Sequence, residues 1–124
     1  MEEAAHKQRI YVYLDDARRC PPGFVLARNA EECILLLKEY DVEILSLDYD
    51  LGWGQATGLE VAKFLAAHAS HSDVTFPREI YLHSSSAIGR LSMYHTLYPH
   101  KPPHGILLNS PMPEETLLRA AQGK

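Results

Sequence analysis

Residues 44–52 combine an apolar run with an abrupt acidic end, and this feature constrains the fold most. They are Ile-Leu-Ser-Leu-Asp-Tyr-Asp-Leu-Gly, and a short apolar run bounded by turn-forming residues is typical of a buried strand. In open α/β sheets, ligands bind at the carboxyl ends of the strands, so Asp48 and Asp50 mark a candidate site. Asp and Gly also open ordinary turns, and a simple turn is the alternative interpretation.

The rest of the chain alternates between predicted strands and predicted helices. Segments rich in β-branched, aromatic or other apolar residues predict four further strands, over residues 9–14, 24–27, 79–83 and 106–108. Apolar residues at helical spacing predict helices over residues 29–40, 57–70 and 87–98, and a short last helix after residue 113. Between the first two strands, Pro21, Pro22 and Gly23 leave no room for a full helix.

Two of these helices carry capping patterns at their starts, formed by Asn29 with Glu32 and by Thr57 with Glu60. In the third helix, four residues at helical spacing are expected to face the core: Ala87, Leu91, Tyr94 and Tyr98.

This alternation predicts a flavodoxin-like α/β fold with a five-stranded parallel sheet in the order 2-1-3-4-5, its first helix missing or shortened. With 124 residues and 46% hydrophobic content, the chain fits a single domain over residues 1–124. In that order the first and third strands are neighbours. Asp15 and Asp16, which follow the first strand, are therefore expected to converge with Asp48 in one site.

The charge balance limits the expected partners. A net charge of −4 and a pI near 5.9, without a block of basic residues, argue against a broad nucleic-acid-binding surface and against binding to anionic membranes. Residues 1–7 lack an apolar signal core and no stretch reaches membrane-spanning length, so we expect a cytoplasmic protein. Cys20 and Cys33 lack zinc-type spacing and are expected to be reduced thiols, with a disulfide left open.

Several carboxylates at one sheet edge repel one another unless a cation relieves them. Hard oxygen ligands suit Mg²⁺ or a similar ion such as Mn²⁺, and Mg²⁺ commonly takes one or two protein carboxylates together with water and phosphate. The sequence thus predicts a divalent metal, Mg²⁺ or Mn²⁺, bound by Asp15, Asp16 and Asp48. The same preference of the ion predicts phosphate chemistry.

Polar residues also follow the fourth strand. His83 lies at its end, where it could exchange a proton during phosphoryl transfer or be structural. Ser84, Ser85 and Ser86 precede a helix whose free N–H groups could bind phosphate oxygens, with Arg90 as a clamp on the same group. The alternative is that one serine is only an N-cap and that Arg90 is a surface charge.

The loop after the opening stretch adds two candidates. Asp50 could orient a catalytic water, or it could only form the turn into Gly52. Trp53 stands between two glycines beside the acidic edge. It could stack on a base, act as a lid, or cover the rim of the core.

The chain resembles the receiver domains of bacterial two-component signalling. The acidic pair Asp15-Asp16, the strand-end Asp48, Ser84 and the five-strand order carry the resemblance. In receivers, the pair and the strand-end aspartate bind Mg²⁺, and that aspartate accepts a phosphoryl group. The lysine that receivers carry after the fifth strand is absent here, and Asn109 stands in its place.

A closer resemblance is to an atypical receiver-like family, the cyclic-phosphate-processing receiver domains. The matching segments are spread along most of the chain, at residues 13–18, 22–24, 47–52, 57–58 and 83–90. That family usually has His where Tyr49 stands and Asn where Ser86 stands, so the roles of Tyr49, Ser86 and Asn109 are open.

Three functional hypotheses follow. The first is a small metal-dependent phosphoesterase-like enzyme that acts on a cyclic phosphate of a nucleotide or RNA end, with Asp48, Asp50 and His83 as catalytic residues. Its partner would be that small phosphorylated ligand or RNA end. The second is a signalling receiver that is phosphorylated on Asp48. The third is a catalytically inert module that binds a nucleotide or a protein.

Overall fold

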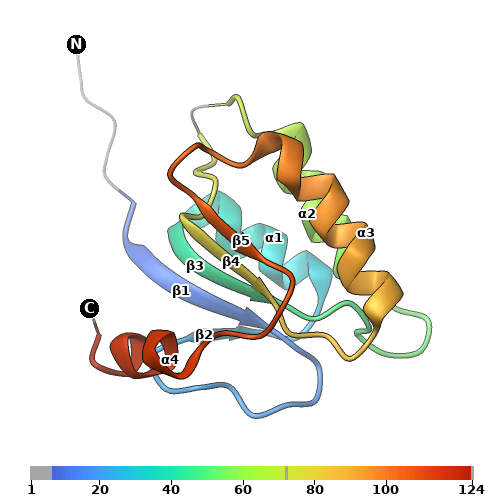
Figure 1. Cartoon of the computed structure of the whole chain (residues 1–124), viewed down its shortest axis with the longest axis horizontal. Coiled ribbons are helices and arrows are strands. Elements are labelled where there is room, and N and C mark those ends of the chain that lie inside the picture. The colour runs from blue at the N-terminus through green and yellow to red at the C-terminus, as the bar shows by residue number, and fades with distance from the viewer. Residues whose placement is uncertain (1–6, 72, 124) are drawn as a thin grey trace.

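The computed structural model describes residues 7–71 and 73–123, and the polar segment 1–6 lies outside the described residues. Its centre is a five-stranded parallel sheet in the order β2-β1-β3-β4-β5 (Figure 1). The predicted flavodoxin-like fold and strand order are therefore confirmed. The strands are β1 (Arg9–Leu14), β2 (Val25–Ala27), β3 (Asp41–Leu47), β4 (Glu79–Leu82) and β5 (Ile106–Leu108).

The register of the sheet brings three strand ends level with one another. Leu14 of β1 pairs with Leu47 of β3, and Leu47 pairs with Leu82 of β4. Each of these leucines is the last residue of its strand. The residue that follows each strand is polar and lies at the same edge of the sheet: Asp15, Asp48 and His83.

Three helices lie on one face of the sheet (Figure 1): α1 (Ala30–Glu39), α2 (Leu59–Ala67) and α3 (Ala87–Leu97), which is followed by a short 3₁₀ turn, η1 (Tyr98–His100). Their buried sides and alternate strand residues such as Val12 and Leu45 form the hydrophobic core. α1 begins as predicted, because the Asn29 side chain accepts a hydrogen bond from the Glu32 N–H.

The start of α2 differs from the prediction. Its N-cap is Gly58 rather than Thr57, and no side chain caps it. A Cβ atom at position 58 would overlap the carbonyl oxygen of Asp48, so this helix start packs directly on the end of β3. A close approach of two backbones, rather than side-chain capping, fixes where α2 begins.

The buried side of α3 also differs from the prediction. The helix buries Gly89, Met93 and Leu97. Of the expected stripe, Tyr94 is half-buried, and three residues are exposed: Ala87, Leu91 and Tyr98. The reason is that the Tyr49 ring packs so closely on Gly89 that a Cβ there would overlap it. A contact with a loop aromatic therefore turns the glycine side of the helix inward.

The opposite face of the sheet is covered differently. Among the described residues, no helix connects β1 to β2, which confirms that the first helix is missing, and α4 (Glu114–Ala121) stands apart from the other helices (Figure 1). α4 buries Thr116 and Ala120. Gly23 has φ +89° and lies against the Ala120 carbonyl, so the short β1–β2 segment and α4 pack together.

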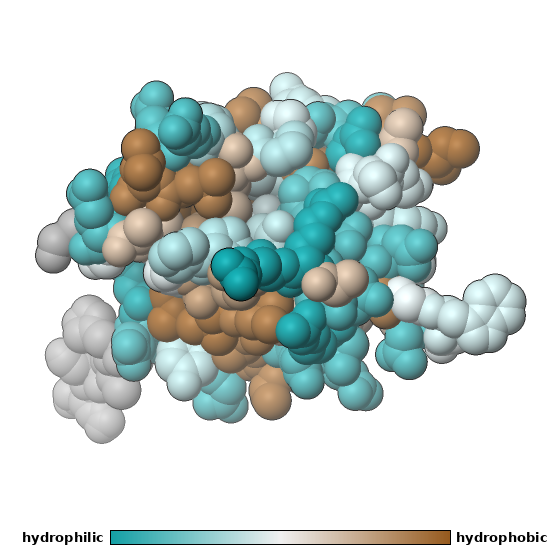
Figure 2. All heavy atoms as spheres, turned by 90° about the horizontal axis from the view of Figure 1, so that it is seen from below, coloured by the Kyte–Doolittle hydropathy of each residue, from teal (hydrophilic) through white to brown (hydrophobic). Residues whose placement is uncertain are grey.

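Apolar side chains remain exposed over several elements. Seen from below, brown hydrophobic patches are separated by hydrophilic side chains (Figure 2). The exposed large hydrophobic residues are Val25, Leu35, Trp53, Ile88, Leu91, Tyr98, Ile106, Leu108 and Leu118. Over residues 7–71 and 73–123, no helix has both the length and the hydropathy to cross a membrane.

Candidate functional site

Asp15, Asp48 and His83 come together at the carboxyl edge of the sheet. They follow β1, β3 and β4, and one ligand atom from each lies within 4.8 Å of the other two. Asp15 is 1% exposed, His83 6% and Asp48 9%. The two acidic strand ends predicted to converge therefore do so, and the histidine of the fourth strand joins them. These three residues are called the acidic group below.

Asp15 is held by the β1–β2 segment and by His83. Its Oδ1 accepts hydrogen bonds from the backbone N–H groups of Ala17 (2.9 Å) and Arg18 (2.8 Å). Its Oδ2 lies 2.9 Å from Nε2 of His83 and 3.9 Å from Nε of Arg18. Burial acts to raise the pKa of Asp15, but these hydrogen bonds outweigh it and hold the pKa below its usual value. Asp15 is therefore a carboxylate at neutral pH.

The His83 ring is fixed at both nitrogens and on one face. Nδ1 lies 2.6 Å from Oγ of Ser46, Nε2 faces Asp15, and the ring stacks on Tyr13 with centroids 4.4 Å apart and planes 2° apart. Nη1 of Arg18 donates to the His83 carbonyl oxygen at 2.6 Å. Burial lowers the pKa of His83, although the nearby carboxylates oppose the shift. The imidazole is therefore neutral at physiological pH, and its contact with Asp15 is a hydrogen bond.

Asp48 is supported mainly through its backbone. Its N–H donates to the Leu14 carbonyl at 3.1 Å, and Gly58 packs against its carbonyl. Burial raises the pKa of the Asp48 carboxyl, a hydrogen bond with the Ser84 side chain opposes the shift, and the charge of Asp15 adds to it. Because the net pKa is raised, a positive charge beside Asp48 would stabilise the folded protein.

Three predicted site residues lie outside this buried group. Asp16 is exposed, and its backbone carbonyl accepts a hydrogen bond from Arg28 Nη1 at 2.9 Å. Asp50 is exposed, and its Oδ1 accepts from the Gly52 N–H at 3.1 Å, which is the turn considered as its alternative role. Trp53 is 100% exposed and does not cover the rim of the core. Its use as a lid or stacking platform stays a prediction.

The three serines have different surroundings at the start of α3. Ser84 is buried, and its Oγ accepts from the Ser86 N–H at 3.1 Å. Ser85 is exposed. Ser86 is the N-cap of α3, and its Oγ accepts from the Gly89 N–H at 3.0 Å. The expectation that one serine caps this helix is therefore confirmed for Ser86.

Arg90 connects the segments that follow β4 and β5. Its Nη1 donates to the Ser84 carbonyl at 2.6 Å, and its Nε donates to Oδ1 of Asn109 at 3.0 Å. Arg90 is therefore more than a solvated surface charge. The side chain holds two strand ends together beside the acidic group.

Three residues of the site were not predicted from the sequence: Tyr13, Ser46 and Arg18. Tyr13 and Ser46 are register partners that lie two residues before the strand-end aspartates, so strand periodicity places them on the same face as those aspartates. That alternation is the signal that could have found them. Arg18 carries no such local signal, because its reach to the end of β4 depends on the irregular path of the β1–β2 segment.

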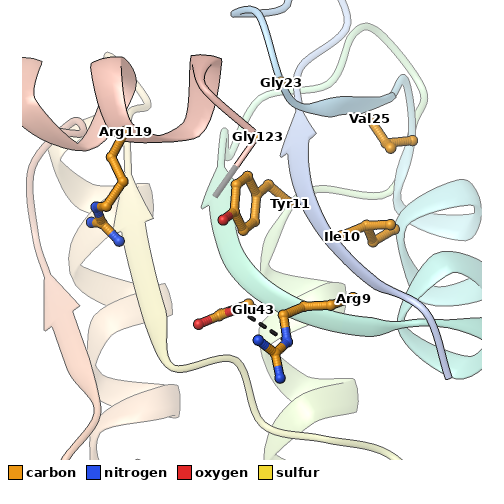
Figure 3. Close-up of a pocket in the computed structure, with 8 residues that line it drawn as sticks. All are labelled: Arg9, Ile10, Tyr11, Gly23, Val25, Glu43, Arg119 and Gly123. Carbon is orange, nitrogen blue, oxygen red and sulfur yellow. Dashed lines mark ion pairs between the residues drawn. The ribbon is translucent and has the colours of Figure 1, made fainter. Parts of the chain in front are cut away.

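A large pocket lies at the other end of the strands (Figure 3). Its volume is about 620 Å³, and its lining includes Arg9, Tyr11, Glu43 and Arg119, from β1, β3 and α4. Arg9 Nε lies 3.3 Å from Glu43 Oε1. No described residue that lines it belongs to the acidic group. Cavity size and chemistry point to different places, and the convergence of ligand atoms makes the strand ends the candidate site.

Comparison with known proteins identifies a family for the chain. The family model of the cyclic-phosphate processing receiver domain matches residues 10–99. The chain belongs to this family. The matched range includes the candidate site from Asp15 to Arg90 and ends before β5. No curated protein and no solved structure matches the chain.

Receiver domains bind Mg²⁺ through acidic residues, and this receiver domain brings two carboxylates and a histidine within reach of one ion. The three positions with open roles have structural partners. Tyr49 packs on Gly89, Ser86 caps α3, and Asn109 accepts from Arg90. Each therefore supports the architecture around the site.

Proposed function

We propose that this domain is a metal-dependent phosphoesterase-like enzyme that processes a cyclic phosphate on a nucleotide or RNA end. The observation that carries the proposal is the convergence of two carboxylates and an imidazole at one sheet edge, close to the start of α3. Membership in the cyclic-phosphate processing receiver family supports the substrate class.

The donor set fits a divalent cation. Asp15 and Asp48 would each supply a carboxylate oxygen and His83 its Nε2 nitrogen, and Asp16 stays a proposed additional ligand. An imidazole nitrogen suits first-row transition metals better than Mg²⁺, which prefers oxygen. We therefore expect Mn²⁺ to bind more tightly than Mg²⁺. A cation held there would polarise the phosphorus centre and activate water.

The start of α3 is the proposed phosphate-binding element. First-turn N–H groups have no backbone partners within a helix and favour an anion. The Gly89 N–H is bonded to the Ser86 side chain, so the proposed donors are the N–H groups of Ala87 and Ile88. Ser85 is exposed beside them, whereas Ser84 and Ser86 also make internal hydrogen bonds. Arg90 uses two of its N–H donors on protein oxygens, and a guanidinium has five, so it retains donors for a phosphate oxygen.

Three other assignments follow from exposure and contacts. Asp50 is the proposed residue for orienting water, because its carboxylate is exposed beside the group. His83 is proposed as a metal ligand ahead of a proton donor, since both ring nitrogens already have partners and the ring is buried. Trp53 is the proposed platform for the base of the substrate.

The test is turnover of a panel of 2′,3′- and 3′,5′-cyclic nucleotides with Mn²⁺ or Mg²⁺. We expect ring opening that stops on chelation and falls at least about a hundredfold in Asp48→Ala. Asp41→Asn is the matched control, because Asp41 begins β3 at the opposite end of the strand. Absence of turnover, or equal turnover in Asp48→Ala, contradicts the proposal.

A second candidate function is phosphoryl acceptance on Asp48, as in a signalling receiver. The supporting observation is that Asp48 directly follows β3 and that the Ser84 hydroxyl is hydrogen-bonded to its carboxylate. Against it stands Asn109, which accepts from Arg90 where receivers have a lysine. Intact mass after incubation with a small phosphodonor decides: an adduct lost in Asp48→Asn favours signalling.

A further inference from the structure

Ser46 carries a buried hydroxyl on a central strand of the sheet, next to the candidate metal site. It lies in β3, is 0% exposed, and its Oγ is 2.6 Å from Nδ1 of His83. Its register partners are Tyr13 in β1 and Tyr81 in β4. A buried polar side chain on a central strand is costly unless it is hydrogen-bonded, so the contact with His83 accounts for its presence.

The hydrogen bonds around His83 define its ring form in the structure. Oδ1 of Asp15 accepts two backbone N–H groups, and these hydrogen bonds favour the carboxylate and help to hold its pKa below the usual value. Oδ2 therefore faces Nε2 as an acceptor, and Nε2 carries the proton. A neutral imidazole then has a bare Nδ1. The Ser46 hydroxyl must donate to it.

A ligand nitrogen needs the opposite arrangement. Nε2 can bind a cation only through its lone pair, and a neutral ring then carries its proton on Nδ1. In that form Nδ1–H donates and the Ser46 oxygen accepts. A hydroxyl is both donor and acceptor, so Ser46 satisfies both ring forms without moving.

Rotation of the ring is the alternative to a change of tautomer, and the surroundings oppose it. Tyr13 stacks on the ring, Arg18 holds the His83 backbone carbonyl, and both nitrogens have fixed partners on opposite sides. A rotated ring would lose the hydrogen bonds of both nitrogens. The position of the proton is therefore the property that can change.

We infer that Ser46 is a positioning residue that lets His83 exchange its Nε2–H tautomer for the Nδ1–H tautomer when a divalent cation binds. The inference rests on the proposed metal site. In the exchange, one proton leaves Nε2 to solvent and one arrives at Nδ1 from solvent, so the ring stays neutral. Ser46 changes from donor to acceptor.

The first test is nitrogen NMR of the full chain labelled with ¹⁵N-histidine, above pH 7, with and without saturating Mg²⁺, which is diamagnetic. The chain has seven histidines, so the His83 signals are assigned by their loss in His83→Gln. We expect a protonated Nε2 without Mg²⁺ and a protonated Nδ1 with it. One tautomer in both samples, or Nδ1–H in the metal-free sample, overturns the inference.

The second test is the affinity of the variants for Mn²⁺ by calorimetry. Loss of a residue that orients a ligating histidine typically weakens metal binding about 10- to 100-fold, and we expect this for Ser46→Ala. Ser46→Thr keeps the hydroxyl and should recover most of the affinity. Thr116→Val is the matched control, because Thr116 is a buried hydroxyl near Tyr81, away from His83.

The outcomes separate this inference from the proposed function. Wild-type binding of Mn²⁺ with equal affinity in Ser46→Ala overturns the role of Ser46 and leaves the metal site standing. No binding of Mn²⁺ or Mg²⁺ to the wild-type chain overturns the proposed metal chemistry, and with it the tautomer exchange.

Discussion

The ends of β1 and β3 are alike in sequence and different in their electrostatics. Each end carries one nearly buried aspartate, Asp15 or Asp48, and one exposed aspartate, Asp16 or Asp50. Asp15 accepts from two backbone N–H groups and faces both His83 and a guanidinium. At Asp48, a hydrogen bond with the Ser84 side chain, the nearby His83 and a hydrogen bond from the Tyr49 backbone oppose the effect of burial but do not outweigh it.

The two buried carboxyls are consequently shifted in opposite directions. Burial acts to raise the pKa of both, but hydrogen bonds reverse the shift for Asp15 and not for Asp48. Asp15 is a fixed part of the fold, whereas the folded chain compensates the charge of Asp48 only in part. A strand-end acid can serve structure or chemistry, and its hydrogen-bond partners decide which.

The largest expected effect comes from removing the Asp15 charge. Asp15→Asn removes the negative charge that two backbone N–H groups and the Arg18 guanidinium now face. We expect a loss of about 3 kcal/mol in the free energy of unfolding, measured by urea denaturation. The neighbouring Asp16→Asn is the control and should change it by less than about 0.5 kcal/mol. Equal effects would erase the distinction between buried and exposed acids.

Metal addition should act through Asp48. Mn²⁺ at a hundred times its dissociation constant stabilises a protein that binds it only when folded by about 2.7 kcal/mol. We expect this increase in the unfolding free energy of the wild-type chain after chelator treatment, and none in Asp48→Asn. Equal stabilisation of the variant would mean that the ion binds elsewhere.

Without metal, Asp48→Asn should stabilise the protein. Burial disfavours the charged carboxylate, and the amide removes that charge while keeping the shape of the side chain. We expect the Tm at pH 7 to rise by a few degrees, measured by thermal unfolding in chelator, while Mn²⁺ binding is lost. A lower Tm would show that the Asp48 charge is compensated within the fold.

The advantage of Asp48→Asn should depend on pH. A carboxyl whose folded pKa is raised binds protons more readily in the native state, so the wild type loses stability as pH rises through that pKa. The difference in Tm between variant and wild type should therefore be small below the ordinary value of 3.8 and grow above it. Asp15 has the opposite sign: its lowered pKa gives stability that is lost as pH falls. A constant difference between pH 3 and 7 would contradict the raised pKa.

The smallest effect is expected at the exposed acid of β3. Asp50→Asn keeps an oxygen that can accept from the Gly52 N–H, so the unfolding free energy should change by less than about 0.5 kcal/mol. A larger loss in urea denaturation would give Asp50 a structural role like that of Asp15.

The sheet order and the meeting of Asp15 with Asp48 could be predicted because strand alternation and strand ends are local patterns. The buried side of α3 could not, since the Tyr49 contact that sets it comes from a distant loop. The different environments of Asp15 and Asp16 were equally hidden. Asp15 and Asp16 are adjacent, so the local sequence does not distinguish them. Only the path of the β1–β2 segment brings backbone N–H groups and His83 to Asp15.

Gly58 has a consequence for judging other chains of this kind. Its φ of −61° is open to any residue, so the glycine is required by the Asp48 carbonyl against it and not by its backbone conformation. A sequence could keep every acidic residue and His83 and still displace Asp48 if position 58 held alanine. In such a sequence every ligand and hydrogen-bond donor of the site would still be present, so their presence alone would not reveal the displacement of Asp48. Glycine at position 58 is therefore a test of whether a relative has an intact site.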